Sequence, residues 1–440
     1  MSRANDLDLR AIFRFWAPLA ATWFMMAGEG PFVAAFIARR PGAESNLAAF
    51  GVALAIAMFI EAPVIMMMSA STALVQDRPS FLALRRFSWS LNVMVTAVIV
   101  LLLLPPVFRF LALRAIELPP EVARLAWSGT AILVPWPAAI GYRRFYQGLL
   151  IRRGLTRRVA YGTVVRLTTM AATATTLAVA TSVPGVVVGA AALSLGVVCE
   201  AVAARVMARR AVAEVWEKER GEALRVREIV RFYVPLALTS MLTLGVYPVI
   251  TFFVGRSRLA LESLAVLPVL NGLVFIHRSP GLAFQEVAIA LQSASRSALR
   301  RLQAFAGLLG VATSGVLAVI AFTPLAGAWF EGVSGLSPAL ARLALLPLRI
   351  LVLLPALEVL LSLQRALLVT ARRTRRITAA TLLEVAVLVA ALAIGTGPLA
   401  MVGVTATACA AMLGRLAANS FLAATSGAAR SSPAAPTADG

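Results

Sequence analysis

The 440-residue chain has almost none of the side chains that metal centres and redox sites use. It contains one histidine and two cysteines, which excludes a structural zinc site built from clustered Cys and His ligands. Cys199 and Cys409 lie inside apolar runs, where a free thiol packs like a small hydrophobic side chain. The sequence also lacks the Gly-rich loop with a lysine that cradles nucleotide phosphates. We therefore expect no cofactor, no metal and no enzymatic activity.

Charged residues are scarce as well. Only 14% of the residues are charged, 60% are hydrophobic, and the mean hydropathy is +0.86, well outside the range of soluble domains. Apolar runs of about 20 residues, the length that crosses a bilayer as a helix, recur along the chain. We expect an all-α integral membrane protein with about twelve transmembrane helices. Their expected centres are near residues 22, 60, 100, 134, 170, 195, 242, 277, 312, 353, 386 and 412.

Acidic residues are outnumbered two to one, with 20 Asp and Glu against 41 Lys and Arg and a net charge of +21. In a twelve-helix arrangement most of the basic residues fall on the side of the two termini, which the positive-inside rule makes cytoplasmic. The densest basic segments are 152–158, 205–231 and 371–376. We expect them to contact anionic lipids at the cytoplasmic face of the cell (inner) membrane, and we expect no nucleic-acid partner.

A segment similar to the first apolar segment occurs a second time in the chain. "LRAIFRFWAPLAATWF" (9–24) is similar to "VREIVRFYVPLALTSM" (226–241), and we call the shift from residue 9 to residue 226 the repeat offset. At this offset Pro63 falls on Pro280, and "LVPWPA" (133–138) resembles "LVLLPA" (351–356) one position further on. Because each half holds an even number of helices, both halves enter the membrane from the same side. The repeat predicts two parallel six-helix bundles around a central cavity.

The repeat also predicts the boundaries of the domains. We expect an N-terminal bundle over residues 1–208, a cytoplasmic linker over 209–226, a C-terminal bundle over 227–425 and a disordered tail over 426–440. The linker is amphipathic, and we expect its apolar side, with Val212, Val215 and Trp216, to lie among the lipid headgroups.

Ionisable residues at membrane depth are the candidates for function, because each costs about 2.5–3.5 kcal/mol at the bilayer centre unless it is paired or wet. Glu29 lies between two glycines and two residues before Pro31, which predicts a bent helix beside a carboxylate. Glu61 lies two residues before Pro63, and its expected repeat partner is His277. These groups are either coupling sites or, for Glu29, a wet residue at the interface.

The stretch "FIHRSPGLAFQE" (275–286) is the most unusual of the apolar segments. It forms either a cavity wall that attracts anions or an internal ion pair that fixes a helix bend, and intramembrane Arg166 and Arg349 leave the same two alternatives. We expect substrate binding by Arg166, His277, Arg278, Arg349 and Glu286, coupling or gating by Glu29, Glu61, Glu358 and Glu384, and hinges at Pro31, Pro63, Pro280 and Pro355.

Two helical halves that each open on "RFxxPLA" resemble the MATE fold within the MOP superfamily of exporters and flippases. "REIVRFYVPLAL" (227–238), "HRSPG" (277–281), "PLRILVLLPALEVLLSLQRALL" (347–368) and "GEG" around Glu29 are similar to the progressive ankylosis (ANK) family. This resemblance implies a secondary transporter of small anions such as pyrophosphate, nucleotide or citrate, with Glu29, His277 and Glu286 lining the cavity. An extra residue before Glu286 departs from the family pattern.

The leading prediction is a monomeric secondary transporter that exports a small anionic organic or phosphate compound, with a proton or sodium ion as the candidate coupling ion. The first alternative is proton- or cation-coupled efflux of cationic drugs. The second is flipping of a lipid-linked saccharide. The third alternative is a scaffold protein that transports nothing, and a charge-lined cavity would argue against it.

Overall fold

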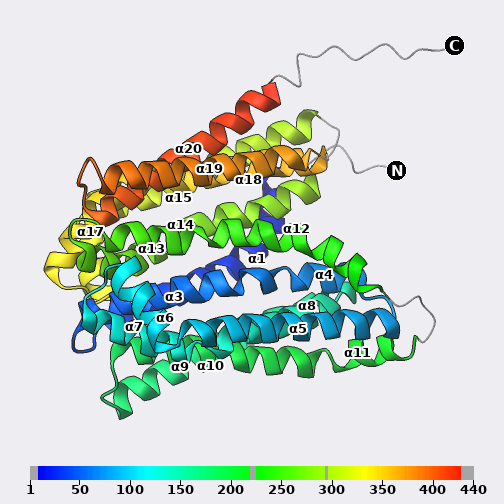
Figure 1. Cartoon of the computed structure of the whole chain (residues 1–440). Coiled ribbons are helices and arrows are strands. Elements are labelled where there is room, and N and C mark those ends of the chain that lie inside the picture. The colour runs from blue at the N-terminus through cyan, green and yellow to red at the C-terminus, as the bar shows by residue number, and fades with distance from the viewer. Residues whose placement is uncertain (1–7, 219–223, 293–295, 372, 428–440) are drawn as a thin grey trace.

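The computed structural model describes residues 8–218, 224–292, 296–371 and 373–427, and every long element in these ranges is a helix (Figure 1). Ten helices are long and apolar enough to cross a membrane. The two remaining expected segments, near residues 134 and 412, are helical as well: α7 (Pro120–Ile132) with α8 (Pro135–Arg152), and α20 (Gly403–Gly427). The prediction of an all-α membrane fold is confirmed.

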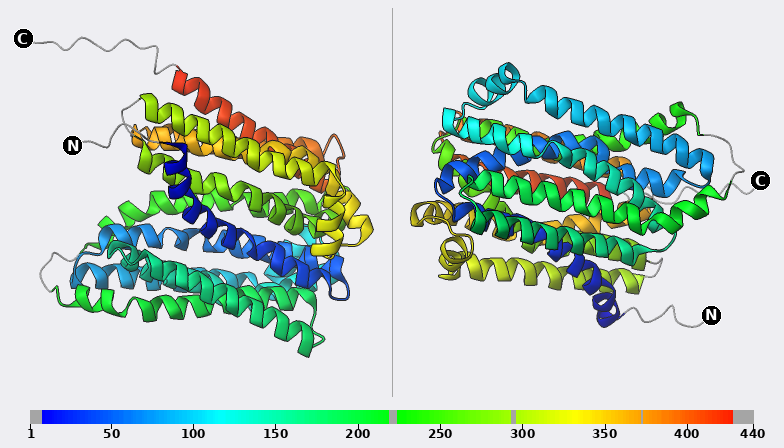
Figure 2. Two further views of the ribbon diagram at one scale, coloured as in Figure 1. Left: turned by 180° about the vertical axis from the view of Figure 1, so that it is seen from behind. Right: turned by 90° about the horizontal axis from the view of Figure 1, so that it is seen from below.

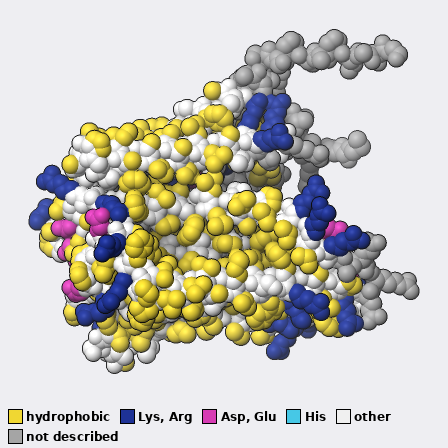
Figure 3. All heavy atoms as spheres, in the orientation of Figure 1, with side chains coloured by type: hydrophobic (Ala, Val, Ile, Leu, Met, Phe, Trp, Pro, Cys, Tyr) yellow, Lys and Arg dark blue, Asp and Glu magenta, His cyan; other side chains and the backbone are white. Residues whose placement is uncertain are grey.

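The surface has the pattern of a membrane-spanning protein. Hydrophobic side chains cover the broad middle of the molecule, and Lys, Arg, Asp and Glu gather at its two ends (Figure 3). The first described helix begins, and the last one ends, at the same end of the bundle (Figures 1 and 2). We call this the terminal end, and the other the opposite end.

The helices fall into an N half and a C half, which we define as residues 9–207 and 226–427. The N half contains α1 (Leu9–Ala27), α2 (Glu29–Ala38), α3 (Ala43–Ile65), α4 (Met67–Leu74), α5 (Arg78–Leu102), α6 (Pro105–Arg109), the π-helix η1 (Phe110–Ala115), α7, α8, α9 (Thr156–Ala180) and α10 (Gly185–Met207). The C half contains α12 (Val226–Leu244), α13 (Val246–Gly255), α14 (Ala260–Leu291), α15 (Arg296–Phe322), α16 (Leu325–Gly327), η2 (Ala328–Val333), α17 (Pro338–Ile350), η3 (Leu351–Leu353), α18 (Leu354–Thr370), α19 (Thr374–Thr396) and α20.

The two halves repeat irregular features as well as helices. The first helix of each half is interrupted at a glycine, Gly28 between α1 and α2 and Gly245 between α12 and α13, and the repeat offset relates these two glycines. The π-helices begin at Phe110 and Ala328, and the separation of these two residues in sequence is one position longer than the repeat offset. A π-helix is rare enough that two at matching places are strong evidence of a common plan. The internal repeat read from the sequence is therefore present in the structure.

The first helices are exchanged between the halves. Near the terminal end α1 packs against α14 and α15 of the C half, and α12 packs against α3 and α5 of the N half. Ile12 is fully buried in a C-half core with Phe284 and Phe305. Ile229, which the repeat offset places opposite Ile12, is fully buried in an N-half core with Phe81. Past the glycine break, α2 returns to its own half and packs against α10.

A pair of hydrogen bonds at matching positions fixes this exchange. Trp16 donates its indole N–H to the Pro280 carbonyl at 3.0 Å. Tyr233, the repeat counterpart of Trp16, donates its hydroxyl to the Pro63 carbonyl at 2.5 Å. Pro63 and Pro280 are themselves related by the repeat offset. We call these the crossed hydrogen bonds; each ties the first helix of one half to the second helix of the other.

The halves also meet at the opposite end. The Arg39 guanidinium donates to the carbonyls of Gly332 and Val333 at 2.8 and 2.9 Å. In the reverse direction, Arg256 of the C half binds the Glu117 carboxylate at 2.9 Å. Both contacts bridge the two halves through the loops and π-helical turns of this end.

The predicted hinge prolines lie at different kinds of site. Pro31 lies in α2, three residues after the break at Gly28. Pro63 lies inside α3, which ends two residues later at Ile65, and Pro355 lies in the first turn of α18, after the single turn of η3. Pro280 lies inside α14, which continues past it without a break.

The linker helix α11 (Arg209–Trp216) packs on protein rather than lipid. Val215 is buried in the N-half core, and the Trp216 ring lies 6.0 Å from the ring of Phe81, with the Arg78 guanidinium over its face. Val215, which we expected to lie among headgroups, is therefore covered by protein, whereas 38% of Trp216 is exposed and its place among headgroups stays a prediction. Residues 219–223 of the predicted linker, and the predicted tail from residue 428 on, lie outside the described residues.

Removing a crossed hydrogen bond should weaken the exchange of first helices. Tyr233 is 2% exposed, so Tyr233→Phe leaves the Pro63 carbonyl without its donor and should lower the free energy of unfolding by about 1–3 kcal/mol. Trp16→Phe should cost about 0.5–1.5 kcal/mol for its hydrogen bond. Thermal unfolding of the purified protein measures both. The exposed Tyr161→Phe is the matched control, and an equal Tm for Tyr161→Phe and Tyr233→Phe would contradict this role.

Candidate functional site

Each half holds a buried cluster of charged side chains at membrane depth. In the N half, the carboxylate of Glu200 on α10 is the centre and is fully buried. It pairs with Arg143 of α8, accepts a hydrogen bond from Gln147 at 3.2 Å, and lies 3.5 Å from Nε of Arg166 on α9. Arg166 also pairs with Glu29, the first residue of α2 after the Gly28 break. We call this set, with Glu61 and Arg144, the N cluster.

Glu61 and Arg144 lie in the same region but are less well paired. Glu61 of α3 is 5% exposed, and among the described residues nothing hydrogen-bonds to its Oε2. Arg144 of α8 contacts the Met68 sulfur at 3.7 Å. The N cluster therefore holds three guanidinium groups and three carboxyl groups, a formal balance in which one carboxyl lacks a direct partner.

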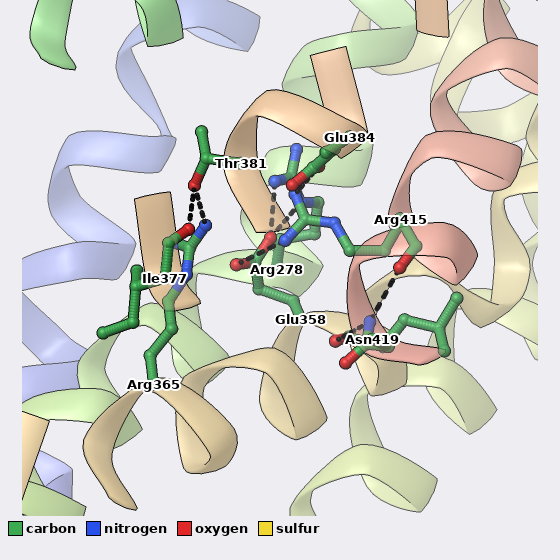
Figure 4. Close-up of polar contacts among 9 residues, drawn as sticks. Arg278, Glu358, Arg365, Ile377, Thr381, Glu384, Arg415 and Asn419 are labelled. Carbon is green, nitrogen blue, oxygen red and sulfur yellow. Dashed lines mark hydrogen bonds and ion pairs between the residues drawn. The ribbon is translucent and has the colours of Figure 1, made fainter. Parts of the chain in front are cut away.

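In the C half, Glu358 of α18 is the centre and is 2% exposed. It accepts from Nε of Arg278 on α14 at 2.9 Å and from Arg415 of α20 at 3.2 Å (Figure 4). Arg415 also lies 3.1 Å from Glu384 of α19. Arg365, about two turns further along α18 and on the same face, donates to the Thr381 hydroxyl at 3.3 Å. This C cluster has three guanidinium groups and two carboxylates, a formal excess of one positive charge.

The two clusters have opposite charges at matching positions. Arg166 of α9 corresponds to Glu384 of α19, because each lies at the same distance in sequence from the start of its helix, Thr156 or Thr374. The crossed hydrogen bonds show that the second helices keep the repeat offset, so Glu61 corresponds to Arg278. The sequence-based pairing of Glu61 with His277 is wrong by one residue, because "FIHRSP" carries one residue more than "FIEAP" before its proline.

The structure brings six of the nine predicted ionisable site residues into the clusters and leaves three outside. The ring of His277 hydrogen-bonds to the Leu273 carbonyl of its own helix at 2.9 Å. Glu286 is exposed, so it is not the internal partner of Arg278, which binds Glu358 instead. Arg349 is exposed on α17, where it contacts the Ala321 carbonyl at 3.3 Å and lies over the Phe322 ring.

Five cluster members were not predicted: Arg143, Arg144, Glu200, Arg365 and Arg415. Glu200 and Arg415 carry the same signal as the predicted residues, a charge inside an apolar run, and were accessible to the same reasoning. Arg143 and Arg144 lie in "YRRFYQ", which has the polar composition of a loop although it is the middle of α8.

A separate cavity of about 710 Å³ lies between the halves and is almost wholly apolar. Helices α3 and α5 form one wall, with residues such as Phe59 and Met94, and α12 and α13 form the other, with Met241 and Phe252. Among the described residues, no group of His, Cys, Asp or Glu could hold a metal ion.

The arrangement of the helices is similar to that in solved structures of membrane transporters. The chain superposes on the inward-facing conformation of a multidrug resistance MATE family transporter of the MOP superfamily with a TM-score of 0.76 and 14% identity, over 94% of this chain and 96% of that one. The fold is that of the MATE transporters. The outward-facing conformation of a MATE family transporter gives a TM-score of 0.64 at 14% identity, over 97% of both chains.

The MATE-like fold also includes a flippase. Lipid II flippase MurJ in its inward closed conformation superposes with a TM-score of 0.73 and 14% identity, over 93% of this chain and 87% of that one. No protein-family model and no curated protein matches the sequence.

The N cluster should be essential for stability. Glu200→Gln leaves Arg143 without its direct counter-charge in a buried place, and we expect a loss of about 3–5 kcal/mol in the free energy of unfolding. Glu214, which pairs with Arg153 and has 55% of its side chain exposed, is the control: we expect Glu214→Gln to cost at most about 1 kcal/mol. Thermal unfolding in detergent compares the two variants. Similar losses in both would show that the buried cluster carries no special load.

Proposed function

We propose that the chain is a secondary transporter that works by alternating access of its two halves. Its fold, shared with MATE transporters and a lipid II flippase, supports a transporter of the MOP type. The exchanged first helices support the mechanism. Because α1 is anchored in the C half and α2 in the N half, any rocking of the halves has to bend the chain at Gly28, and likewise at Gly245.

We propose a small organic or phosphate anion as the substrate. The excess positive charge of the C cluster carries this proposal, because its two carboxylates cannot neutralise all three guanidinium groups and the cluster as a whole attracts an anion. The accessible member is Arg278: 26% of its side chain is exposed, against 2% for its partner Glu358. A ligand that approaches this cluster therefore meets the cation first.

The position of Arg278 suits a transported ligand. It lies on α14, which packs against α3 of the N half as well as against α1. A substrate bound here would lie at the boundary that alternating access opens and closes. The similarity of "HRSPG" to the ANK family adds pyrophosphate, nucleotide and citrate as candidate substrates and export as the direction. The proposed transporter is a monomer in the cell (inner) membrane. Its termini lie on the cytoplasmic side, as the positive-inside rule predicts.

A flippase is the second candidate. The apolar cavity between α3, α5, α12 and α13 suits a hydrocarbon tail, and MurJ has the same fold. Efflux of cationic drugs is less well supported. Three carboxylates would bind a cation: Glu29, Glu61 and Glu358. Glu29 and Glu358 are held by Arg166 and Arg278, so a drug would have to displace a buried arginine. Glu61 has no direct ion pair among the described residues, but the positive charges of Arg143, Arg144 and Arg166 oppose a cationic drug there.

Uptake into proteoliposomes tests the proposed substrate. We expect labelled pyrophosphate or citrate to accumulate with the wild-type protein and uptake to fall by about tenfold or more in Arg278→Ala, since a charged hydrogen bond contributes about 1.5–3 kcal/mol. Glu358 keeps Arg415 in this variant, so the C cluster should still fold. Arg342→Ala removes an exposed arginine from α17 and should leave uptake unchanged.

A cationic dye and a polyprenyl-linked fluorescent saccharide complete the assay. Dye transport with inert anions would overturn the anion proposal in favour of drug efflux. Movement of the lipid-linked saccharide between leaflets, with both soluble classes inert, would favour the flippase.

A further inference from the structure

Glu61 differs from every other glutamate of the two clusters. Glu29, Glu200, Glu358 and Glu384 each bind an arginine directly. Glu61 is 5% exposed, more buried than Glu29 and Glu384, yet in the described part of the chain it has no ion pair within 4 Å and no donor to its Oε2. An ionised carboxylate in such a place is costly, so the site favours a ligand that neutralises it.

The surroundings of Glu61 indicate which ligand that is. The charged groups that act on it through space are Arg144 and Arg143 of α8 and Arg166 of α9. The three guanidinium groups oppose a metal cation and a proton alike, so the choice between them rests on ligands: the described residues contain no group of acidic or imidazole side chains that could hold a metal ion around Glu61. A proton needs no coordination shell, and it binds to the carboxyl itself.

Protonation of Glu61 changes the charge of the whole site. With Glu61 ionised, the N cluster balances three carboxylates against three guanidinium groups. With Glu61 protonated it gains one positive charge, in addition to the excess that the C cluster already has. The two sites are linked across the halves, since α3 packs against α14 and Tyr247 of α13 lies within electrostatic range of both Glu61 and Arg278.

We propose that Glu61 is a proton-binding site whose protonation strengthens anion binding between the halves, so that one proton and the anion bind and cross together. This inference rests on the proposed anion transport and adds its coupling ion and the sign of the coupling. By linkage, the anion must raise proton affinity at Glu61 by the same factor as the proton raises anion affinity. A proton gradient would then drive the anion in the direction of proton flow and would not exchange the two, so export against an inward proton gradient requires a larger outward gradient of the anion.

Calorimetry on the purified protein tests the linkage. We expect the affinity for citrate to weaken between pH 6 and pH 8 by up to about tenfold per pH unit for one linked proton. Binding measured at pH 8 in two buffers of different ionisation enthalpy should report proton uptake by the wild type. Glu61→Gln should take up no proton and bind citrate with less dependence on pH; the titration of citrate itself is common to both proteins. Glu121→Gln, which removes an exposed glutamate of α7, should behave like the wild type.

Infrared spectroscopy tests the proton site without any ligand. Acidification of the wild type should produce the C=O band of a protonated buried carboxyl, and this band should be missing in Glu61→Gln but present in Glu121→Gln. If the band persists in Glu61→Gln, or if citrate binds the wild type without proton uptake, the inference is overturned while anion transport stands. If neither citrate nor pyrophosphate binds, the proposed function fails, and the band alone decides whether Glu61 takes a proton.

Discussion

The exchange of the first helices is the constraint on which the rest of this structure depends. Ile12 is buried in the C half and Ile229 in the N half, and the crossed hydrogen bonds fix both helices there. When the C half moves, α1 has to move with it, although α2 packs on the N half. When the N half moves, α12 has to move with it, although α12 belongs in sequence to the C half. In the proposed alternating access, the motion would be concentrated at Gly28 and Gly245. Glycine suits these positions because it places no side chain in the angle of the bend.

Within each half, the buried charges oppose movement. In the N half, Arg166 and Glu200 join α9 to α10. In the C half, Glu384 and Arg415 join α19 to α20. The polarity is reversed between the halves, but the mechanical result is the same. Breaking either pair in a low-dielectric interior is expensive, so each half should move as a unit. Mobile joints between the halves and rigid clusters within them are the two properties that alternating access needs.

Much of the fold could be predicted because it depends on two sequence patterns, the length of apolar runs and an internal repeat. Apolar runs long enough to cross a bilayer indicated the helices, and the repeat of "RFxxPLA" indicated two parallel halves. The exchange could not be predicted, because Ile12 and Ile229 are apolar residues on apolar helices whichever half they enter. For the site, a charge at membrane depth was a sufficient signal for Arg166, Arg278 and Glu358. This signal could not predict which charged side chains form ion pairs. One inserted residue also led the sequence comparison to match Glu61 with His277 instead of its repeat counterpart Arg278.

The most direct test of the moving halves is a pair of distances measured by electron spin resonance. Spin labels at Arg86→Cys on α5 and Ala304→Cys on α15, in a background without Cys199 and Cys409, span the two halves near the terminal end. Labels at Arg86→Cys and at Arg209→Cys on α11, which packs on the N half, serve as the internal reference. The account predicts two distance populations between halves, whose ratio shifts with citrate or pyrophosphate, and one unchanged population for the reference pair. A single fixed distance between the halves under all conditions, or a change confined to the reference pair, would contradict it.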